Sequence, residues 1–405
     1  MSTDYVFMTL FRSDNPYSSV SLSMARELAG RNRTLYVNHP YTLKDIALGW
    51  RRDPALRRRL WRILSGRNAY ETLREQGKEI WVATPPPVLP VNWLPPGAIY
   101  RFFHQINQAI VLRALRKALR RYGIGPRFVY INCYDPFYLG SIPKRLGARI
   151  RIYHCIDEIS QDPYTARHGV ALEQEAMRDA DHTLCTSRGL YALCRPHARR
   201  LSLFHNAADI GLFSRALTER FERPEELTGR QGPVVGFTGN LDPLRIDYDL
   251  LTRTARTHPD KTFLIVGPIN SPQVRESGLQ ALPNVVLTGA RPIAHLPALL
   301  QHMDCVLLPF LCNRLTACIY PLKINEYLAA GKSVISTAFS EDIRTFAHCI
   351  YLAETADDFV RLIDAAIADG SEEAKLRRAA AARGNSWADR IAQLEQIVAQ
   401  HDEQV

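Results

Sequence analysis

The sequence lacks the features that mark membrane-spanning, secreted or zinc-binding proteins. No stretch approaches the 18 uncharged apolar residues that indicate a transmembrane helix. MSTDYVFMTLF at the start carries an acid and has neither a basic start nor a small-residue cleavage site, so we expect a first strand and no signal peptide. The eight cysteines are scattered without a C-x-x-C pair, which is typical of buried thiols in a reducing cytoplasm. We therefore expect a cytoplasmic protein without a metal site.

Two common nucleotide-binding motifs are also missing. GFTG (236–239) is not G-x-G-x-x-G, and no G-x-x-x-x-G-K-[ST] occurs, so neither the dinucleotide fingerprint nor the P-loop applies. The acids of DYD (247–249) have the spacing of a metal-binding pair. They directly precede the helix pattern LLTRTAR, however, and helix capping explains them better.

The charge is distributed unevenly. The chain has 405 residues and a net charge of +10, which is long enough for two hydrophobic cores. Residues 1–210 carry a balance of +14 and residues 211–405 a balance of −4. This asymmetry predicts that the first half faces something anionic.

Strand and helix patterns alternate in both halves of the chain. YVFMTLF, RTLYVN, FVYINC, RIRIYHC and HTLCTS are predicted strands of the first half, and PVVGFTG, TFLIVG, NVVLTG, CVLLPF and SVIST of the second. Strands separated by helices predict parallel sheets. The polar stretch FERPEELTGRQGP (221–233) is the best linker. We therefore predict an α/β fold with two facing Rossmann-like domains, 1–222 and 223–385. Ser386 and Asp389 predict a capping box for a last helix in 386–405.

The stretch YPLKINEYLAAGKSVIST (320–337) predicts a helix followed by a buried strand. Pro321 and Gly331 bracket the helix, because proline fits a first turn and glycine the position after the end. Lys323 is unexpected in that first turn, where the helix dipole disfavours a cation. An anion docked on the helix N-terminus would explain it, and Glu326 would then accept hydrogen bonds from adjacent hydroxyls, such as those of a ribose. Phosphate and ribose together indicate a nucleotide; the alternative is a solvated Lys–Glu pair.

Polar residues also follow strands of the first half. His154 and Asp157 lie at the end of RIRIYHC, at the sheet edge where ligands of parallel sheets bind. The alternative is that His154 packs under the sheet and Asp157 caps whatever structure follows it. Ser18 or Ser19 is expected to cap the first helix, whose N-terminus would bind an acceptor anion together with Arg12; capping without a ligand explains the pattern equally well.

The second half resembles a known family. PLKINEYLAAGKSVIST is similar to PLK-x-x-EYLAAGKPVVST of bacterial glycosyltransferases with the two-Rossmann (GT-B) fold, in the branch that builds teichuronic acids and exopolysaccharides. VVGFTGNLDPLRIDYDLL, LPNVVLTGARPIAHLPALLQHMDCVLLPF and FHNAADIGLF also resemble stretches of these enzymes. The resemblance is strong over about 180–390. SWADR resembles their terminal helix, which crosses back to the first domain.

The resemblance implies that the second domain holds a donor nucleotide sugar and the first an acceptor. By position, Glu326 would bind the ribose and Lys323 would face the diphosphate. The remaining donor-binding residues that it implies are Thr316, Gly239, Asn240, Arg245, Arg291 and Tyr320. The nucleobase would lie near Gly289. The sequence departs from many relatives, which have Arg and Lys where Asn240 and Arg245 stand and an acid in place of Cys318.

Glycosyl transfer also requires groups that act on the acceptor and on the leaving diphosphate. An inverting transfer needs a base for the acceptor hydroxyl, for which Asp157 is the best candidate, and the resemblance puts His154 against the donor sugar. A retaining transfer needs no such base. Lys323, Arg245 and backbone N–H groups would neutralise the leaving diphosphate without a metal.

Two basic segments predict binding to an anionic membrane. Residues 44–67 contain eight Lys or Arg interleaved with apolar side chains, and residues 112–127 add six cations. Such a composition is typical of segments that lie on anionic lipid at the inner face of a membrane. A solvated helix is the alternative. Nucleic acid is disfavoured, because no common nucleic-acid-binding module is visible.

We therefore predict a glycosyltransferase of cell-surface polysaccharide biosynthesis. It would move a sugar from a UDP or GDP sugar to a glycan or lipid-linked acceptor. A nucleotide-sugar epimerase of the same fold and a non-catalytic nucleotide-sugar-binding protein are the alternatives.

Overall fold

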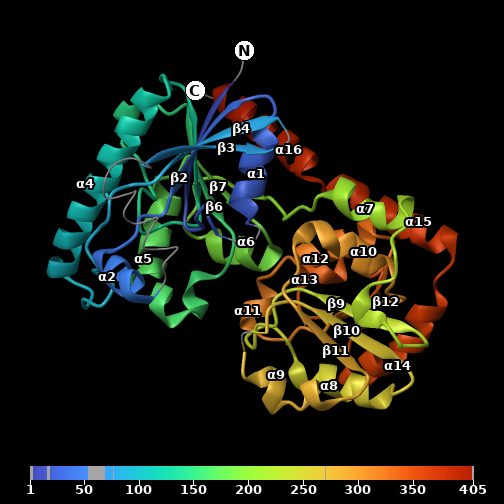
Figure 1. Cartoon of the computed structure of the whole chain (residues 1–405). Helices are drawn as coiled ribbons and strands as arrows, with labels where there is room; N and C mark the ends of the chain where they lie inside the picture. Colours follow the sequence, from blue (N-terminus) through green and yellow to red (C-terminus); the bar gives the residue numbers. More distant parts are fainter. Residues whose placement is uncertain (1–2, 16–18, 53–68, 76, 270, 404–405) are drawn as a thin grey trace. The chain divides into compact units, whose positions relative to one another are not determined.

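The computed structural model describes residues 3–15, 19–52, 69–75, 77–269 and 271–403 (Figure 1). Contacts divide the chain into two compact units, each built around one sheet. The N-terminal unit contains Met1–Thr186, Leu190–Phe204 and Ile391–Val405, and the C-terminal unit contains Ser187–Gly189 and His205–Arg390.

The N-terminal unit contains an eight-stranded sheet with the order β3-β4-β2-β1-β5-β6-β7-β8. All neighbours are parallel except β3 and β4, which are antiparallel. The strands are β1 (Asp4–Thr9), β2 (Arg33–Asn38), β3 (Tyr70–Glu75), β4 (Lys78–Ala83), β5 (Val129–Cys133), β6 (Ile150–Cys155), β7 (His182–Cys185) and β8 (Leu201–Leu203). The helices are α1 (Val20–Leu28), α2 (Leu43–Arg52), α4 (Ala98–Arg121), α5 (Pro163–Asp179), α6 (Arg188–Cys194) and α16 (Trp387–Asp402).

The C-terminal unit contains a six-stranded, all-parallel sheet with the order β11-β10-β9-β12-β13-β14. Its strands are β9 (Val234–Thr238), β10 (Thr262–Val266), β11 (Val285–Gly289), β12 (Cys305–Leu308), β13 (Ser333–Thr337) and β14 (Tyr351–Ala353). Its helices are α7 (Ile210–Thr218), α8 (Tyr248–Thr257), α9 (Gln273–Glu276), α10 (Leu296–Gln301), α11 (Arg314–Ala317), α12 (Leu322–Ala329), α13 (Glu341–Arg344), α14 (Ala356–Ala368) and α15 (Glu372–Ala382).

Successive residues of the buried strands supply two separate cores in the C-terminal unit. Val234 of β9 packs with α7, α10 and α12, whereas its neighbour Val235 packs with α8 and α14. Helices therefore cover both faces of this sheet, as Figure 1 shows. This arrangement follows from the period of two along a strand, because both faces of a parallel sheet are buried.

The helix and strand predicted in 320–337 are confirmed. Pro321 precedes α12, and Gly331 takes the left-handed conformation (φ +69°) after its end. The amide of Gly331 donates to Leu328 O and that of Lys332 to Tyr327 O, which satisfies the last carbonyls of the helix. The strand SVIST follows as β13 and is buried throughout.

The predicted caps are also confirmed. The side chain of Asp247 accepts a hydrogen bond from Leu250 N at the start of α8. Ser386 and Asp389 form the reciprocal bonds of a capping box before α16. Each cap joins residues only three positions apart, which is why the local sequence predicts it.

Contacts divide the C-terminal helix α16 between the two units and place α7 in the C-terminal unit. From Ile391 onwards α16 belongs to the N-terminal unit, where Gln393 donates to Leu203 O at 2.8 Å. Phe213 of α7 is fully buried in the C-terminal unit. Contacts therefore divide the chain between Phe204 and His205, whereas the sequence-based domain limits at 222/223 and 385/386 remain predictions.

Candidate functional site

Glycines stand at the carboxyl ends of β9, β10 and β11, so the backbone at these positions carries no side chains. We call Gly239, Gly267 and Gly289 the glycine edge. Gly239 N donates to Val266 O at 2.8 Å, and Gly267 N donates to Gly289 O at 3.1 Å. A Cβ on Gly267 would lie 1.7 Å from Gly239 O, so only glycine fits there. Gly239 and Gly289 were predicted from the sequence but Gly267 was not, although TFLIVG ends in glycine like the two neighbouring strands.

Lys323 and Glu326 lie beside this glycine edge. Lys323 is the second residue of α12, and its Nζ is 2.7 Å from Glu326 Oε2. A Cβ built on Gly239 would lie 3.6 Å from Lys323 Cε, so the structure brings these three predicted residues together. The two side chains are only 26% and 9% exposed, so the pair is not the fully solvated one of the alternative interpretation. Because a buried carboxylate needs a partner, Glu326 holds the lysine at a position that the helix dipole disfavours.

Tyr327 fastens α12 to the end of β9. Its buried hydroxyl accepts from Thr238 N at 2.8 Å and lies 3.2 Å from Thr238 O, the other backbone polar atom of the last residue in β9. Burial raises the pKa of Tyr327 far above its ordinary value, so the hydroxyl keeps its proton. Tyr327 was not predicted from the sequence, because its partner Thr238 lies 89 positions away.

The loops after β9 and β12 are joined by backbone contacts. Leu311 N donates to Arg245 O at 2.8 Å, and Ile246 and Phe310 form an antiparallel bridge. The Arg245 guanidinium lies 3.4 Å from Asp242, and Asn240 is exposed. Both predicted residues therefore belong to the loop that follows the glycine edge.

Three other predicted donor-binding residues are engaged with protein groups. The Thr316 hydroxyl is fully buried in the capping box of α11, where it accepts from Asn313 N at 3.1 Å. Tyr320 is buried, and its ring stacks on His205 with centroids 4.5 Å apart. Arg291 pairs with Glu226 at 2.7 Å, which lowers the pKa of that carboxyl. Donor binding by these three side chains remains a prediction.

His154 packs inside the sheet of the N-terminal unit. The ring is fully buried at the end of β6, 5.3 Å from the Phe204 ring between centroids. Its Nδ1 is 3.9 Å from Cys133 Sγ, and its Nε2 has no hydrogen-bond partner among the described residues. Burial lowers the pKa of His154 to about 3, so the imidazole is neutral near pH 7. His154 is therefore packed inside the protein, as the alternative interpretation of the sequence expected. Its contact with a donor sugar remains a prediction.

Asp157 comes after β6 in an irregular segment and is partly buried. The next α-helix, α5, is capped by Asp162, which accepts from Thr165 N at 2.9 Å, so Asp157 is not the cap of α5. The alternative interpretation that Asp157 caps the segment directly after it remains a prediction. The role of Asp157 as a base also remains a prediction.

The predicted anion-binding residues near α1 make contacts within the protein. Arg12 forms a two-pronged pair with Asp14, with both contacts at 3.1 Å, and donates to His39 O at 2.6 Å. Ser19 caps α1, as predicted, by accepting from Leu22 N at 3.2 Å. Ser18 lies outside the described residues. Binding of an acceptor anion at Arg12 or Ser19 remains a prediction.

A histidine–aspartate pair at the carboxyl edge of the same sheet was missed. His39 follows β2 and Asp135 follows β5, and Nδ1 of the one is 2.8 Å from Oδ2 of the other. Asp135 is fully buried and accepts from Tyr138 N at 3.2 Å, whereas the His39 side chain is 25% exposed. The carboxylate favours the tautomer with a proton on Nδ1, which leaves Nε2 able to accept one. His39 directly follows the predicted strand RTLYVN, and Asp135 comes two residues after the end of FVYINC; these positions are the signal that would have found them.

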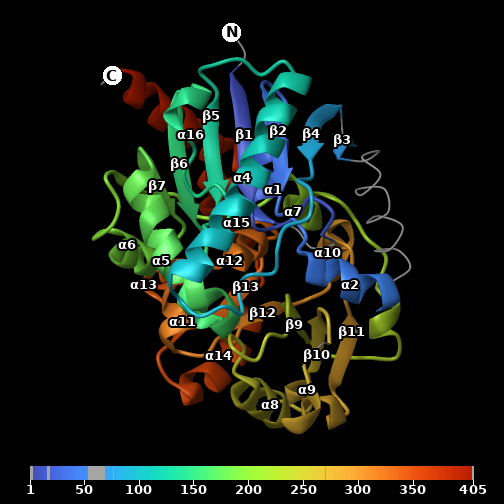
Figure 2. The ribbon, with the colours of Figure 1, turned by 90° about the vertical axis from the view of Figure 1, so that its left-hand side faces the viewer.

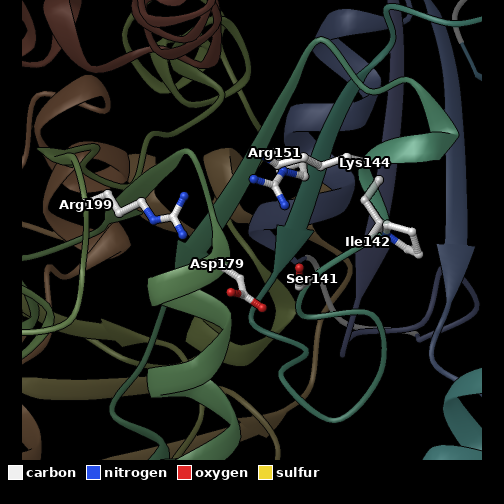
Figure 3. A pocket seen from close by; sticks show the side chains of 7 residues that line it. Ser141, Ile142, Lys144, Arg151, Asp179 and Arg199 are labelled. Atoms are coloured by element: carbon white, nitrogen blue, oxygen red, sulfur yellow. The ribbon is translucent and has the colours of Figure 1, made fainter.

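A cavity of about 420 Å³ lies at the other end of β6 (Figure 3). It is lined by Ser141, Ile142, Pro143, Lys144, Arg151, Asp179 and Arg199. In Figure 3 the guanidinium groups of Arg151 and Arg199 and the Asp179 carboxylate surround the same space. Arg151 is already paired with Asp181 at 2.7 Å. Because ligands of open parallel sheets bind at the carboxyl ends of the strands, we do not assign this cavity to the site.

In the described part of the chain, no group of three His, Cys, Asp or Glu side chains is placed to hold a metal ion. No described helix is long and apolar enough to span a membrane. All eight cysteines are described and none forms a disulfide.

Residues 232–369 match the family model described as glycosyl transferases group 1. The matched segment is about a third of the chain and contains the whole C-terminal sheet together with Gly239, Lys323 and Glu326. TuaH of Bacillus subtilis (strain 168), named as a teichuronic acid biosynthesis glycosyltransferase, is 31% identical over 166 residues. That match covers 40% of this chain and 42% of TuaH, so the chain matches less than half of this relative's length.

Solved structures similar to the whole chain confirm the fold. A sucrose-phosphate synthase from Thermosynechococcus elongatus matches with a TM-score of 0.66 and 14% identity, covering 100% of both chains. A UDP-forming α,α-trehalose-phosphate synthase from Burkholderia vietnamiensis matches with 0.67 and 13%, covering 99% and 100%. HepE of Anabaena in complex with UDP-glucose matches with 0.64 and 15%, covering 98% and 100%. The predicted two-domain, Rossmann-like α/β fold is therefore confirmed.

Proposed function

We propose that the protein is a glycosyltransferase that moves a sugar from a nucleotide-diphosphate sugar to a glycan or lipid-linked acceptor of a cell-surface polysaccharide. The observation that carries the proposal is the Lys323–Glu326 pair beside the bare backbone of Gly239, in the segment that matches group 1 glycosyl transferases. UDP is the first nucleotide to test, because HepE is similar in structure and was solved with UDP-glucose. GDP is the second.

The chemistry of the pair fits a nucleotide diphosphate. On binding, Lys323 would exchange the Glu326 carboxylate for a phosphate oxygen, at a helix N-terminus whose N–H groups favour anions. Glu326 would then accept hydrogen bonds from the ribose hydroxyls. As the bond between the anomeric carbon and the diphosphate breaks, the ammonium group stabilises the negative charge that grows on the leaving oxygen. This account needs no metal.

Two groups of the N-terminal unit are candidates for activating the acceptor hydroxyl in an inverting transfer. Asp157 is the candidate derived from the sequence. The His39–Asp135 pair is the second, because its buried carboxylate orients the imidazole and leaves Nε2 without a hydrogen bond to any described residue. Arg12 and Ser19 stay candidates for holding an anionic group of the acceptor.

A thermal-shift panel of UDP-, GDP-, ADP- and dTDP-sugars, run with EDTA, tests donor binding, because a ligand that binds the folded state raises its melting temperature. We expect one nucleotide class to raise it and the shift to survive EDTA. Product analysis with donor alone separates the alternatives: an epimerase converts the sugar without an acceptor, and a binding protein never releases the nucleotide. Absence of any shift with all four classes would contradict the proposal.

A further inference from the structure

The helix α4 exposes an apolar stripe at its N-terminal end. Ile99, Phe102 and Ile106 recur at the spacing of one helix face and are 65%, 60% and 36% exposed. Trp93, just before the helix, is 68% exposed, and Tyr164 at the start of α5 is 65% exposed. Five of the twelve large apolar side chains that are exposed in the described residues therefore belong to this one region.

Contacts within the N-terminal unit hold these residues together. Asn92 Nδ2 donates to Tyr164 O at 2.8 Å, which ties the segment before α4 to α5. The rings of Tyr100 and His168 stack with centroids 3.6 Å apart and join the two helices one turn further on. The apolar region is thus a fixed surface formed by two helices and the segment before α4.

Cations continue the same face towards the C-terminal end of α4. Arg113, Arg116 and Arg120 extend the series of Ile99 and Ile106 at intervals of three, four and seven residues. None of these three arginines forms an ion pair with a described residue. The 24 residues of α4 contain six Lys or Arg and no Asp or Glu. The exposed side of α4 therefore joins an apolar end to a basic end.

The opposite side of α4 fixes this orientation. Val111, Leu115 and Ala118 are buried against β1 and β2 in the core of the N-terminal unit. Figure 2 shows α4 on the side of this unit that faces the viewer. A helix held by its buried side cannot turn its apolar residues inwards, so their exposure needs a partner to explain it.

We propose that this α4 face, made of Trp93, Ile99, Phe102, Ile106, Tyr164, Arg113, Arg116 and Arg120, docks the protein on an anionic lipid bilayer. The apolar end would insert between headgroups while the arginines bind lipid phosphates, as in interfacial amphipathic helices. Charge complementarity selects this occupant: residues 1–210 carry a balance of +14, and the acid-free helix α4 of a second copy would repel it. The proposal extends the predicted membrane binding of 112–127 to an apolar surface. The other predicted segment, 44–67, lies largely outside the described residues.

Vesicle sedimentation of the full-length protein tests the proposal. Wild-type protein should bind phosphatidylcholine vesicles that contain phosphatidylglycerol, release in high salt, and bind pure phosphatidylcholine much more weakly. Replacing Arg113, Arg116 and Arg120 by Gln should lower binding on the order of 100-fold. Phe102→Ser should lower it about tenfold, because one side chain no longer inserts.

Matched controls separate this face from a general effect of charge or exposure. Arg195, Arg220 and Arg256 are exposed, and replacing all three by Gln removes the same charge elsewhere. Leu376→Ser removes an apolar side chain that is 60% exposed in the C-terminal unit. Both control proteins should bind as wild type does.

Several results would overturn the proposal. Equal binding to neutral vesicles, equal losses in the controls, or unchanged binding of the α4 variants would each do so. A wild-type dimer that Phe102→Ser dissociates without changing vesicle binding would make the face a self-association surface. Loss of duplex DNA binding alone in the triple variant would assign it to nucleic acid. Empty vesicles contain neither donor nor acceptor, so the outcome does not depend on the proposed transferase activity.

Discussion

Replacing Lys323 by Met separates a ligand-binding role of the Lys323–Glu326 pair from a structural one. The substitution keeps the length of the side chain but removes the charge that faces Glu326 Oε2 at 2.7 Å. Glu326 is 9% exposed, so its carboxylate would remain buried without its cation. A second protein, with Lys323→Met and Glu326→Gln together, removes both charges and leaves no unpaired carboxylate.

The expected magnitudes differ for stability and for ligand binding. An unpaired buried carboxylate costs about 1–3 kcal/mol of unfolding free energy, which lowers the melting temperature by about 2–4 °C per kcal/mol for a unit of this size. Loss of a hydrogen bond to a charged phosphate weakens nucleotide affinity about 10- to 150-fold. The double variant should regain most of the stability but not the affinity.

Calorimetry with the nucleotide that raises the melting temperature in the thermal-shift panel measures affinity. Thermal unfolding without ligand measures stability. The pair Glu372–Lys375 in α15 provides a control, because it has the same three-residue spacing and a 2.6 Å contact. Lys375→Met should leave nucleotide affinity unchanged. If Lys323→Met lowers the melting temperature while affinity stays at the wild-type value, the pair is structural and the donor binds elsewhere.

Three further predictions concern positioning, acceptor activation and pH. Tyr327→Phe should weaken nucleotide affinity severalfold and leave the fold intact, since it frees the end of β9 from α12; calorimetry and circular dichroism check both. Asp157→Asn should lower the rate of transfer at least about 100-fold with unchanged nucleotide affinity, and His39→Gln is measured in parallel. If either variant turns over normally, the residue replaced in it is not the base. Burial raises the pKa of Glu173 from 4.5 to about 7, so the folded state binds the proton more tightly and loses stability as pH rises through this window. Glu173→Gln should therefore increase the free energy of unfolding at pH 8 by up to about 3 kcal/mol, which raises the melting temperature, and change both little at pH 4. Equal shifts at both pH values would contradict this.

The sequence predicted the parts of the fold that depend on neighbours along the chain. The limits of α12 follow from Pro321 and Gly331, and the caps at Ser19 and Asp247 bind amides three residues away. The alternation of strands and helices predicted the parallel strands of both sheets, but not the antiparallel strand β3 of the N-terminal sheet. Lys323 and Glu326 were found because they are three positions apart on one helix, where an unfavourable charge is visible in the sequence itself.

Contacts between distant residues needed the tertiary structure. Tyr327 and Thr238 are 89 positions apart, and His39 and Asp135 are 96 apart, so no local pattern pairs them. The structure also showed which side of α4 is buried. The spacing of Ile99, Phe102 and Ile106 predicts one face of a helix, but only packing against a sheet decides whether that face is buried or exposed. Sequence determined the elements and their ends, because short-range hydrogen bonds and hydrophobic period act within a few residues. Folding decided which side chains meet and which stay exposed, because that depends on how distant strands are ordered in the sheet.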